Sequence, residues 1–433
     1  MTPQSSFMVL AAVNPTREAE LHRLLASMND APGRVKPENA LIPFRQFDSL
    51  HVARLLIVDD RTVDDIHVYG IAPRTYPRYF SFLGDVDGDA DAFLTEMARR
   101  APEGLRALFS CCEGFTSGTD LVEWMKAHSV PTAAGYVNWR GRTVQQVREE
   151  AALRDALEGH IQSHAAALKG LSPKEIRATL RSLVMADVAG GRLTLSPERP
   201  TPLGWWLRNL LHLIGVPLLL LLTSPLLIVA AAIGLVRLRQ LEKTDPELCH
   251  RSVPADSAEL ALLEDHDVTN QFTAMGSLKP GIVRLWIAIF VLLIIDYAAR
   301  HVYTRGGLAR VRSIHFARWV FLDNRQRIIF LSNYDGSLES YMDDFINKVG
   351  FGLNVVFSNG IGYPRTNWLL LNGCSDERKF KEYLRRHQMP TQVWYKAYPG
   401  LTAVDLERNG RIRQGLESSS MREDEAAKWV ALL

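Results

Sequence analysis

Residues Trp205–Arg237, WWLRNLLHLIGVPLLLLLTSPLLIVAAAIGLVR, are the stretch that decides the fold. After Arg208 the stretch holds no Asp, Glu or Lys and no Arg before its last residue, so its apolar run exceeds the roughly 20 residues that span a bilayer. Its two prolines, Pro217 and Pro225, each remove a backbone hydrogen bond from a helix. A straight helix of this length would measure about 45 Å, longer than the ~30 Å hydrocarbon core. The run therefore predicts either one kinked, tilted span or a helical hairpin that turns near Leu222–Pro225.

Composition limits the classes of protein that fit this chain. Its 433 residues leave room for two or three domains with sizeable cores. With 50 basic and 48 acidic residues, the net charge of +2 gives no argument for a nucleic-acid partner. No signal peptide is predicted, because only Met8–Val13 is apolar near the start and no basic segment precedes it. The cysteines show no CxxC spacing, so we expect reduced thiols in a cytosolic setting and no metal site (Cys111, Cys112, Cys249 and Cys374).

The first half of the chain alternates apolar runs with amphipathic segments. Leu50–Val58, LHVARLLIV, is apolar enough to be a strand buried on both faces. Three more strands and two helices are predicted around it: Ser6–Val13, Tyr79–Leu83 and Leu105–Cys111, and Glu18–Met28 and Ala90–Arg100. This βαββαβ order predicts a ferredoxin-like α+β unit, with helices on one face of an antiparallel sheet.

The second half of the chain repeats the first in blocks of matching residues. Ser49–Arg54, SLHVAR, matches Ser313–Arg318, SIHFAR, without a gap. Further identities follow at held spacing, with Asp87, Glu123, His128, Pro131, Tyr136, Gly141 and Thr143 matching Asp335, Glu382, His387, Pro390, Tyr395, Gly400 and Thr402. We therefore predict a tandem duplication of the ferredoxin-like unit.

The duplication divides the chain into segments. We expect the first repeat in residues 1–158 and the second in residues 266–420. Between them lie a helical linker (159–204), the membrane segment (205–237) and a second linker (238–265).

An apolar helix is expected within the second repeat, at residues 282–299. Its centre, Leu285–Ile295, is uninterrupted but too short to cross a bilayer, and the repeat aligns it with the soluble helix Glu18–Met28. Two interpretations remain open: a helix wholly inside the core, or a helix whose outer face contacts the membrane. We favour the second, because the helix is apolar all round.

Two copies that pack together must lie on one side of a membrane, which requires an even number of crossings. Basic residues flank the apolar run on both sides, so neither end shows the asymmetry that orients a single span (Arg199, Arg208, Arg237, Arg239 and Lys243). We therefore favour a monotopic hairpin in the membrane, with both soluble halves facing the cytoplasm.

Polar residues of the second repeat are candidates for a functional site. His315 and Arg318 lie in the strand IHFARWVFL, on opposite faces unless a bulge intervenes. Both types recur in the first repeat, which favours structural roles for them. Asp335 stands in an Asp-Gly pair before a helix, where a turn-and-cap role is the alternative to a functional one.

The site is expected in the second half because this half departs from a plain soluble pattern. It carries the apolar helix, a basic run after Arg300 and an extra segment between Gly362 and Lys379. These features predict a pocket near the membrane surface, with Asp335 and either Arg318 or His315 as its polar groups.

One motif gives a family resemblance. Gly84-x-x-Asp87-Gly88, within the duplicated ferredoxin-like organisation, resembles the GxxDG motif of dye-decolourising (DyP-type) haem peroxidases in the dimeric α/β-barrel superfamily. The resemblance implies haem as the cofactor and Asp87 as the distal acid, although Ser332 replaces the first glycine in the second repeat. The proximal haem ligand stays open among three histidines: His266, His315 and His387.

Two function classes remain open. The first is a membrane-associated oxidoreductase that resembles haem peroxidases and acts on a lipid-soluble or small oxidisable substrate. The second is a non-catalytic membrane-bound module that binds a lipid or a partner protein. In both cases the expected partners are membrane lipid and an apolar small molecule, not nucleic acid. The sequence specifies neither the oligomeric state nor a cofactor beyond the haem that the resemblance implies. The acidic segment Glu264–Asp267 is expected to be a solvated loop rather than a metal site.

Overall fold

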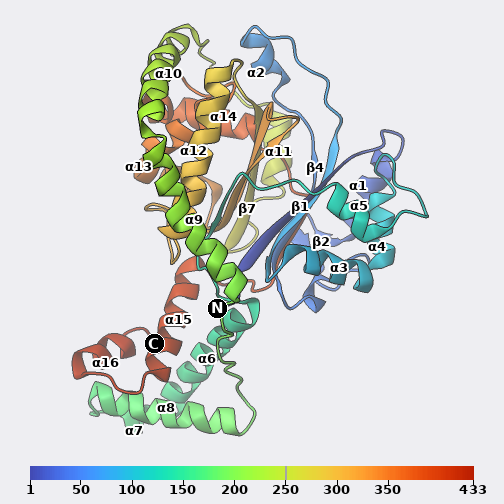
Figure 1. The fold of residues 1–433 in the computed structure, drawn as a ribbon. Helices are drawn as coiled ribbons and strands as arrows, with labels where there is room; N and C mark the ends of the chain where they lie inside the picture. Colours follow the sequence, from blue (N-terminus) through green and yellow to red (C-terminus); the bar gives the residue numbers. More distant parts are fainter. Residues whose placement is uncertain (249–250) are drawn as a thin grey trace.

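The computed structural model describes residues 1–248 and 251–433 and shows a mixed α+β protein with two antiparallel four-stranded sheets (Figure 1). Cys111, Cys112 and Cys374 are free thiols, whereas Cys249 lies outside the described residues. In spatial order, the first sheet contains β1 (Gln4–Ala12), β5 (Tyr79–Asp87), β4 (Leu50–Val58) and β12 (Val393–Lys396), and the second contains β6 (Ala134–Val137), β8 (Ile314–Leu322), β9 (Arg327–Asp335) and β7 (Thr269–Ser277). The predicted α+β class is confirmed.

Each sheet takes its fourth strand from the other half of the chain. The C-terminal strand β12 pairs antiparallel with β4, and β6 of the first half pairs antiparallel with β8. Neither half therefore completes a four-stranded sheet on its own. The two halves are joined by backbone hydrogen bonds as well as by side-chain packing.

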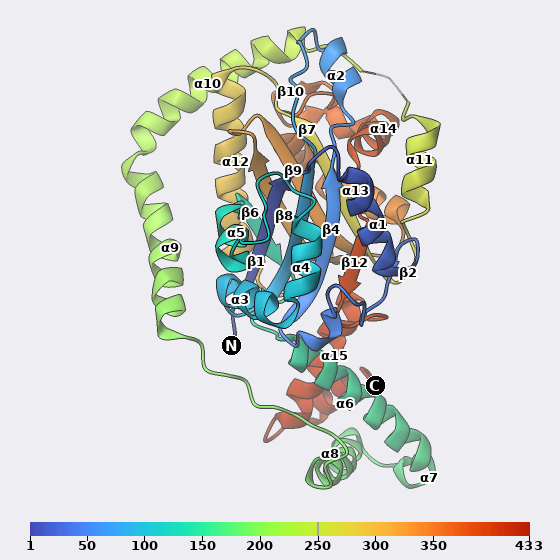
Figure 2. The same ribbon diagram turned by 90° about the vertical axis from the view of Figure 1, so that its right-hand side faces the viewer.

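The two sheets pack face to face and helices cover their outer faces. Apolar side chains of β4 and β8, such as Leu56 and Val320, share one core between the sheets. The opposite face of β4, with Leu55, belongs to the core under the first helical layer, so all nine residues of β4 are buried as predicted. The helices over the first sheet are α1 (Glu18–Ser27), α3 (Ala90–Arg100), α4 (Pro102–Phe109) and α5 (Leu121–Ala127), and those over the second are α12 (Ile282–His301), α13 (Leu338–Phe357) and α14 (Glu377–His387) (Figure 2).

One predicted strand is a helix. Residues Leu105–Cys111 were expected to form the fourth strand of the first repeat, but most of them belong to α4. Pro102 at the helix start needs no backbone N–H there, and Leu105, Leu108 and Phe109 bury one helical face. A short apolar run has no periodicity that separates strand from helix, which explains the error.

A separate group of helices lies below the sheets (Figure 1). It consists of α6 (Val144–Ser163), α7 (Ala165–Leu168), α8 (Pro173–Ala189), α15 (Ala403–Glu417) and α16 (Glu423–Val430). Leu153, Leu180, Ile412 and Trp429 form its core, so the linker predicted between the repeats packs against the C-terminal end of the chain. The described residues also form short helical elements, which are α2 (Val63–Val68), α11 (Pro254–Ala261) and the 3₁₀ turns Phe44–Gln46 and Gly373–Ser375, and a small hairpin of β2 (Asn29–Ala31) and β3 (Arg34–Val35).

The central apolar stretch forms two consecutive helices, α9 (Leu203–Leu222) and α10 (Ser224–Thr244), which we call the strap. The helices meet at Thr223, inside the predicted turn, whereas Pro217 is accommodated within α9. The predicted hairpin is not formed, because α10 does not fold back along α9: Figure 2 shows α9 rising beside the molecule and α10 continuing over its top. The strap thus bows away from the sheets and rejoins them at its far end.

Among residues 1–248 and 251–433, three helices, α9, α10 and α12, are long and apolar enough to cross a membrane by length and composition. The prediction that this region is too short to cross rests on its uninterrupted centre, Leu285–Ile295, whereas the helix extends beyond that centre at both ends. In the structure α12 packs one face on the second sheet, with Ala288 and Leu292 buried. Its other face exposes a stripe of apolar side chains at helical spacing: Ile282, Trp286, Phe290, Leu293 and Ile294.

Candidate functional site

The predicted site residue Asp335 ends strand β9, and both of its carboxylate oxygens are engaged. Oδ1 lies 2.6 Å from Nε2 of His315 and accepts a hydrogen bond from Thr269 Oγ1 at 3.0 Å. Oδ2 accepts the backbone N–H of Ala403, the first residue of α15, at 2.7 Å. A carboxylate placed there satisfies an unpaired helix donor and complements the helix dipole. The structure brings Asp335 and His315 together, and their contact connects β8 and β9 to α15; we call this arrangement a joint.

The first half contains a joint of the same composition. His51 Nε2 lies 2.9 Å from Asp87 Oδ1, and Asp87 Oδ2 accepts the backbone N–H of Val144, the first residue of α6, at 2.8 Å. The other ring nitrogen of His51 is 3.0 Å from the hydroxyl of Tyr398. Asp87, the residue on which the peroxidase resemblance depends, is therefore held by a histidine and a helix N–H, as Asp335 is.

Arg318 lies apart from the pair of His315 and Asp335. A β-bulge interrupts the pairing of β8 with β9 between Ile314 and Ala317, yet Arg318 still points into the space between the sheets. Its guanidinium donates to the carbonyl oxygens of Phe7 (2.8 Å) and Gly84 (3.0 Å) and forms an ion pair with Asp85 at 2.6 Å.

Arg54 makes the reciprocal cross-sheet contacts from the first sheet. Its guanidinium donates to the carbonyl oxygens of Phe272 and Ser332, but no carboxylate lies within ion-pair distance among the described residues. Burial and the nearby charge of Arg318 lower the pKa of Arg54. The two arginines thus fasten the sheets to each other and leave no guanidinium at the candidate site.

Gly84, the first residue of the GxxDG motif, is explained by packing. A Cβ at this position would lie 2.7 Å from the carbonyl oxygen of Val52 and 2.8 Å from the ring of Phe7, so a larger residue would displace backbone and core. The glycine therefore serves close approach of strands rather than a ligand.

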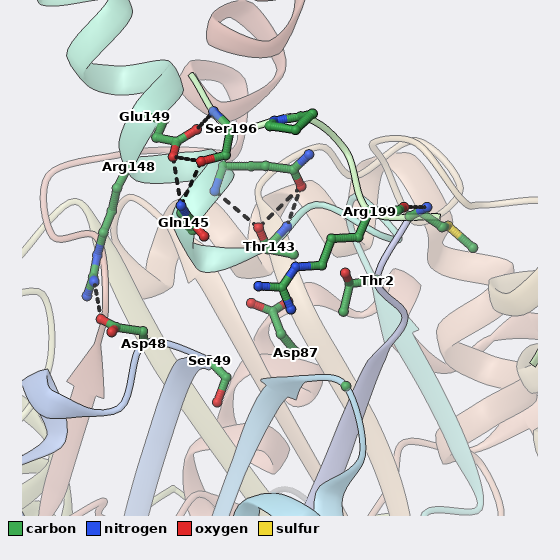
Figure 3. Close-up of a pocket in the computed structure, with 14 residues that line it drawn as sticks. Thr2, Asp48, Ser49, Asp87, Thr143, Gln145, Arg148, Glu149, Ser196 and Arg199 are labelled. Atoms are coloured by element: carbon green, nitrogen blue, oxygen red, sulfur yellow. Dashed lines mark hydrogen bonds and ion pairs between the residues drawn. The ribbon is translucent and has the colours of Figure 1, made fainter. Parts of the chain in front are cut away.

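The pocket next to Asp87 tests whether these residues fit a haem (Figure 3). It has a volume of about 760 Å³ and is lined mainly by polar and charged side chains, including Asp48, Arg148, Glu149 and Arg199. No histidine, cysteine or tyrosine occurs among its lining residues in the described parts of the chain. Because the carboxylate of Asp87 is already committed to His51 and α6, the residues present do not fit a haem, and no step is derived through one.

The three candidate proximal histidines are also engaged with protein groups. His387 places Nδ1 2.9 Å from the carbonyl oxygen of Met275 and Nε2 3.1 Å from Asp65. His266 places Nε2 2.6 Å from the carbonyl oxygen of Leu262, and Nε2 of His315 contacts Asp335. Within residues 1–248 and 251–433, no group of three or more His, Cys, Asp or Glu side chains is arranged to hold a metal ion.

The acidic segment Glu264–Asp267 forms ion pairs with separate parts of the chain and is not simply a solvated loop. Glu264 pairs with Arg385 at 2.6 Å, Asp267 pairs with Lys396 at 2.5 Å, and Asp265 accepts the N–H of Leu338. These partners point in different directions, so the segment fastens the linker rather than a metal.

Asp65 and His387 belong to a buried charge cluster that the sequence did not reveal. The carboxylate of Asp65 pairs with His387 and, at 3.1 Å, with Arg386. Burial opposes ionisation of Asp65, but hydrogen bonds and charge from His387 and Arg386 keep the pKa of its carboxyl below the usual value. The cluster fixes α2 to α14.

The strap is held to α12 at its base by three polar contacts, which we call the strap clamp. Asn209 Oδ1 accepts from Arg300 Nε at 3.0 Å, His212 Nδ1 lies 2.8 Å from His301 Nε2, and Tyr297 donates its hydroxyl to the carbonyl oxygen of Leu213 at 3.0 Å. No residue of α9 is buried, so these contacts rather than packing hold the helix. The sequence signal for this clamp is the helical spacing of polar residues in two otherwise apolar helices: Asn209 and His212 in α9, and Tyr297, Arg300 and His301 in α12.

The far end of the strap is fixed by buried charges, which we call the anchor cluster: Glu242, Asp245, Lys279 and Arg284. Asp245 pairs with Lys279 at 2.8 Å and with Arg284 at 2.5 Å. Burial opposes the charge on Asp245, but these two cations hold the pKa of its carboxyl below the usual range. The cluster joins the end of α10 to the start of α12.

Glu242 extends the anchor cluster to the extra segment of the second half. It accepts hydrogen bonds from the hydroxyl of Thr366 and from the N–H groups of Trp368 and Leu369, each at 2.8 Å. This segment forms a small hairpin of β10 (Thr366–Asn367) and β11 (Leu371–Asn372). Its exposed Trp368 and Leu371 add to the apolar surface beside α10.

Comparison with known proteins adds no relative to this picture. No protein-family model matches the chain, and searches of curated proteins and of solved structures give no significant match. The resemblance to the peroxidases stays an expectation from sequence.

Proposed function

We propose that this protein is a non-catalytic, membrane-bound binding module whose strap enters one leaflet of a bilayer. The observation that carries the proposal is the exposure of the strap: α9 buries no residue, and α10 buries only Leu238 and Glu242. Apolar surface of this extent, outlined by Leu219, Leu226 and Ile233, exceeds what soluble monomers normally expose.

The path of the strap supports insertion from one side. The strap clamp and the anchor cluster attach both of its ends to α12, while its apolar middle bows outward (Figure 2). Arg208 precedes this apolar middle, and Arg237 and Lys243 follow it. Such basic flanks suit headgroups at both ends of an inserted segment.

The exchanged strands support a location of both halves on the same side of the membrane. Strands β6 and β12 each complete a sheet of the other half, and Arg54 and Arg318 bond across the sheets. A bilayer between the halves would break these contacts. With basic flanks on both sides of the strap, we infer that this side is the cytoplasm.

We further propose that the chain arose by duplication of a ferredoxin-like unit. Support comes from paired interactions, since Asp87, which pairs with His51, accepts the first N–H of α6 as Asp335, which pairs with His315, accepts the first N–H of α15. The bulge in β4 after Leu50 and the bulge in β8 after Ile314 are a second correspondence.

The same paired interactions favour binding over catalysis. A carboxylate that accepts a helix N–H in both halves has a structural role in each half, which favours binding over catalysis at this pair. We therefore prefer the module to the peroxidase-like oxidoreductase, because the residues that imply haem do not fit it.

The proposal is tested by charging the strap. In Leu219→Asp/Leu226→Asp/Ile233→Asp, the protein should leave the membrane fraction in alkaline carbonate about tenfold more than the native chain, because each apolar side chain buried in lipid is worth ~1.5–3 kcal/mol. Leu262→Asp, at an exposed leucine outside the strap, is the matched control and should stay in the membrane fraction. Unchanged extraction of the triple variant would contradict the proposal.

A further inference from the structure

A pocket of about 480 Å³ lies between the strap and α12. Its apolar wall comes from α9, α12 and the end of β8: Val216, Ile289, Leu292, Leu293 and Phe321. His212 and Asp296 supply polar groups to the same pocket. Along α12 the apolar lining residues come first and Asp296 follows them. Arg300 of the strap clamp lies one turn after Asp296, so the surface changes along the helix from apolar to charged.

Two arginines, Arg140 and Arg300, lie near the Asp296 end of the pocket but are not among its lining residues. Arg140 Nε is buried without a hydrogen-bond partner in the described chain. The guanidinium of Arg300 donates to Asn209, and neither arginine forms an ion pair among the described residues. Burial, followed by the charge of Arg300, lowers the pKa of Arg140, and Asp296 offsets this only in part. Two neighbouring guanidiniums that form no ion pair within the described chain favour an anion beside them.

Asp296 does not neutralise this pair. Its Oδ1 accepts the backbone N–H of Gly135 at the edge of the second sheet, at 3.3 Å. A further arginine, Arg325, lines the pocket on its other side. The charged groups around the pocket thus leave a net positive charge.

We propose that this pocket binds an anionic phospholipid, with its phosphate on Arg140 and Arg300 and an acyl chain along the apolar faces of the strap and α12. The inference rests on the proposed membrane-bound function, which brings the open side of the pocket to lipid. Guanidinium groups bind phosphate through paired, charge-assisted hydrogen bonds, and the apolar wall suits a hydrocarbon chain. An inorganic phosphate would satisfy the arginines but leave that wall uncovered.

The test measures lipid retained by the full-length protein in detergent, by native mass spectrometry, after addition of phosphatidylglycerol, phosphatidylcholine or inorganic phosphate. The native chain should retain phosphatidylglycerol in preference to both other probes. Arg140→Gln/Arg300→Gln should reduce this retention about tenfold or more, since charge-assisted hydrogen bonds are lost. Leu293→Trp, which fills the pocket from a half-exposed rim position, should reduce it without changing a charge.

The matched control is Arg310→Gln/Arg312→Gln, which removes two exposed arginines outside the pocket and should retain the lipid as the native chain does. The inference is overturned if both pocket variants, folded by melting temperature, retain phosphatidylglycerol like the native chain. Equal retention of inorganic phosphate and of phosphatidylglycerol would also overturn it. Flotation of the native chain with vesicles of both lipids separates the two proposals: flotation without retained lipid refutes the pocket alone, whereas absence of flotation refutes the membrane-bound function.

Discussion

Nε2 of His315 lies 2.6 Å from Oδ1 of Asp335, while the other oxygen of that carboxylate holds the first N–H of α15. The pair therefore connects the second sheet to the helices below it. Because His51 and Asp87 do the same for the first sheet, the pair is a structural joint that occurs in both halves.

Loss of either carboxylate should destabilise the protein to a similar extent. Asp335→Ala and Asp87→Ala each leave a histidine and a helix N–H without an acceptor, which costs roughly 1–3 kcal/mol per buried group. Denaturant unfolding in detergent measures this, with Asp30→Ala at an exposed position as the control. Neither variant should alter bound lipid, and the native protein should show no Soret band. Loss of ligand from Asp335→Ala alone, at unchanged stability, would identify a binding residue instead.

The two cross-sheet arginines should differ in their effect on stability. Arg318→Met leaves the carboxylate of Asp85 buried without its ion-pair partner, and breaking a buried pair costs about 3–5 kcal/mol. Arg54→Met leaves only uncharged carbonyl, amide and hydroxyl acceptors without their donor and should cost less, about 1–3 kcal/mol. Denaturant midpoints give the order, and a larger loss for Arg54→Met would show that the cross-sheet contacts are misassigned.

Stability should depend on pH through Glu150, a buried residue of α6 that forms an ion pair with Arg142. Burial raises the pKa of Glu150 to about 7, even though Arg142 opposes this shift. Because the pKa of Glu150 is higher in the folded state than in the unfolded state, its favourable contribution to the free energy of unfolding is fully present below about pH 4.5. This contribution is lost as the pH rises through about 7. Glu150→Gln should therefore flatten this slope and stabilise the protein above pH 7 by about 2–3 kcal/mol.

Melting curves between pH 4.5 and 8 measure this effect. Glu158→Gln, on a more exposed turn of the same helix, is the matched control and should not reproduce the flattening. An unchanged slope in Glu150→Gln would assign the pH dependence to other groups.

Asp245→Asn should release the far end of the strap. The substitution leaves Lys279 and Arg284 buried without their shared carboxylate, a loss of about 3–5 kcal/mol. We expect faster proteolysis just after α10 and a lower melting temperature. Glu247→Gln removes a nearby but half-exposed acid and should change neither. Equal proteolysis of the native chain and Asp245→Asn would exclude an anchoring role.

Local patterns predicted those parts of the fold that depend on local chemistry. The apolar run Leu50–Val58 became the buried strand β4, and the apolar helix in the second half became α12. Alternation along β8 separated Arg318 from His315 correctly in space. Asp335 also caps a helix, but this helix is the distant α15 and not α13, which follows it in sequence, so the local pattern did not predict its partner.

The contacts between segments that are distant in sequence could not be predicted from local patterns. Nothing local in Val393–Lys396 or Ala134–Val137 shows that these strands join the sheet of the opposite half. The pairing of Asp245 with Arg284 joins charges from two segments that each look like the edge of an apolar run. The bow of the strap follows from these attachments, so a hairpin was the simpler expectation from sequence.

The location of both halves on one side of the membrane is the central claim, and cysteine labelling tests it most directly. A single cysteine is introduced at an exposed site, either before the strap (Ser117→Cys) or after it (Lys428→Cys). The background chain carries Cys249→Ser, and its other native cysteines are buried. A membrane-impermeant maleimide is applied to intact and to permeabilised cells. We predict that both sites react only after permeabilisation. Reaction of one site in intact cells and of the other only after permeabilisation would place the halves on opposite sides and contradict the account.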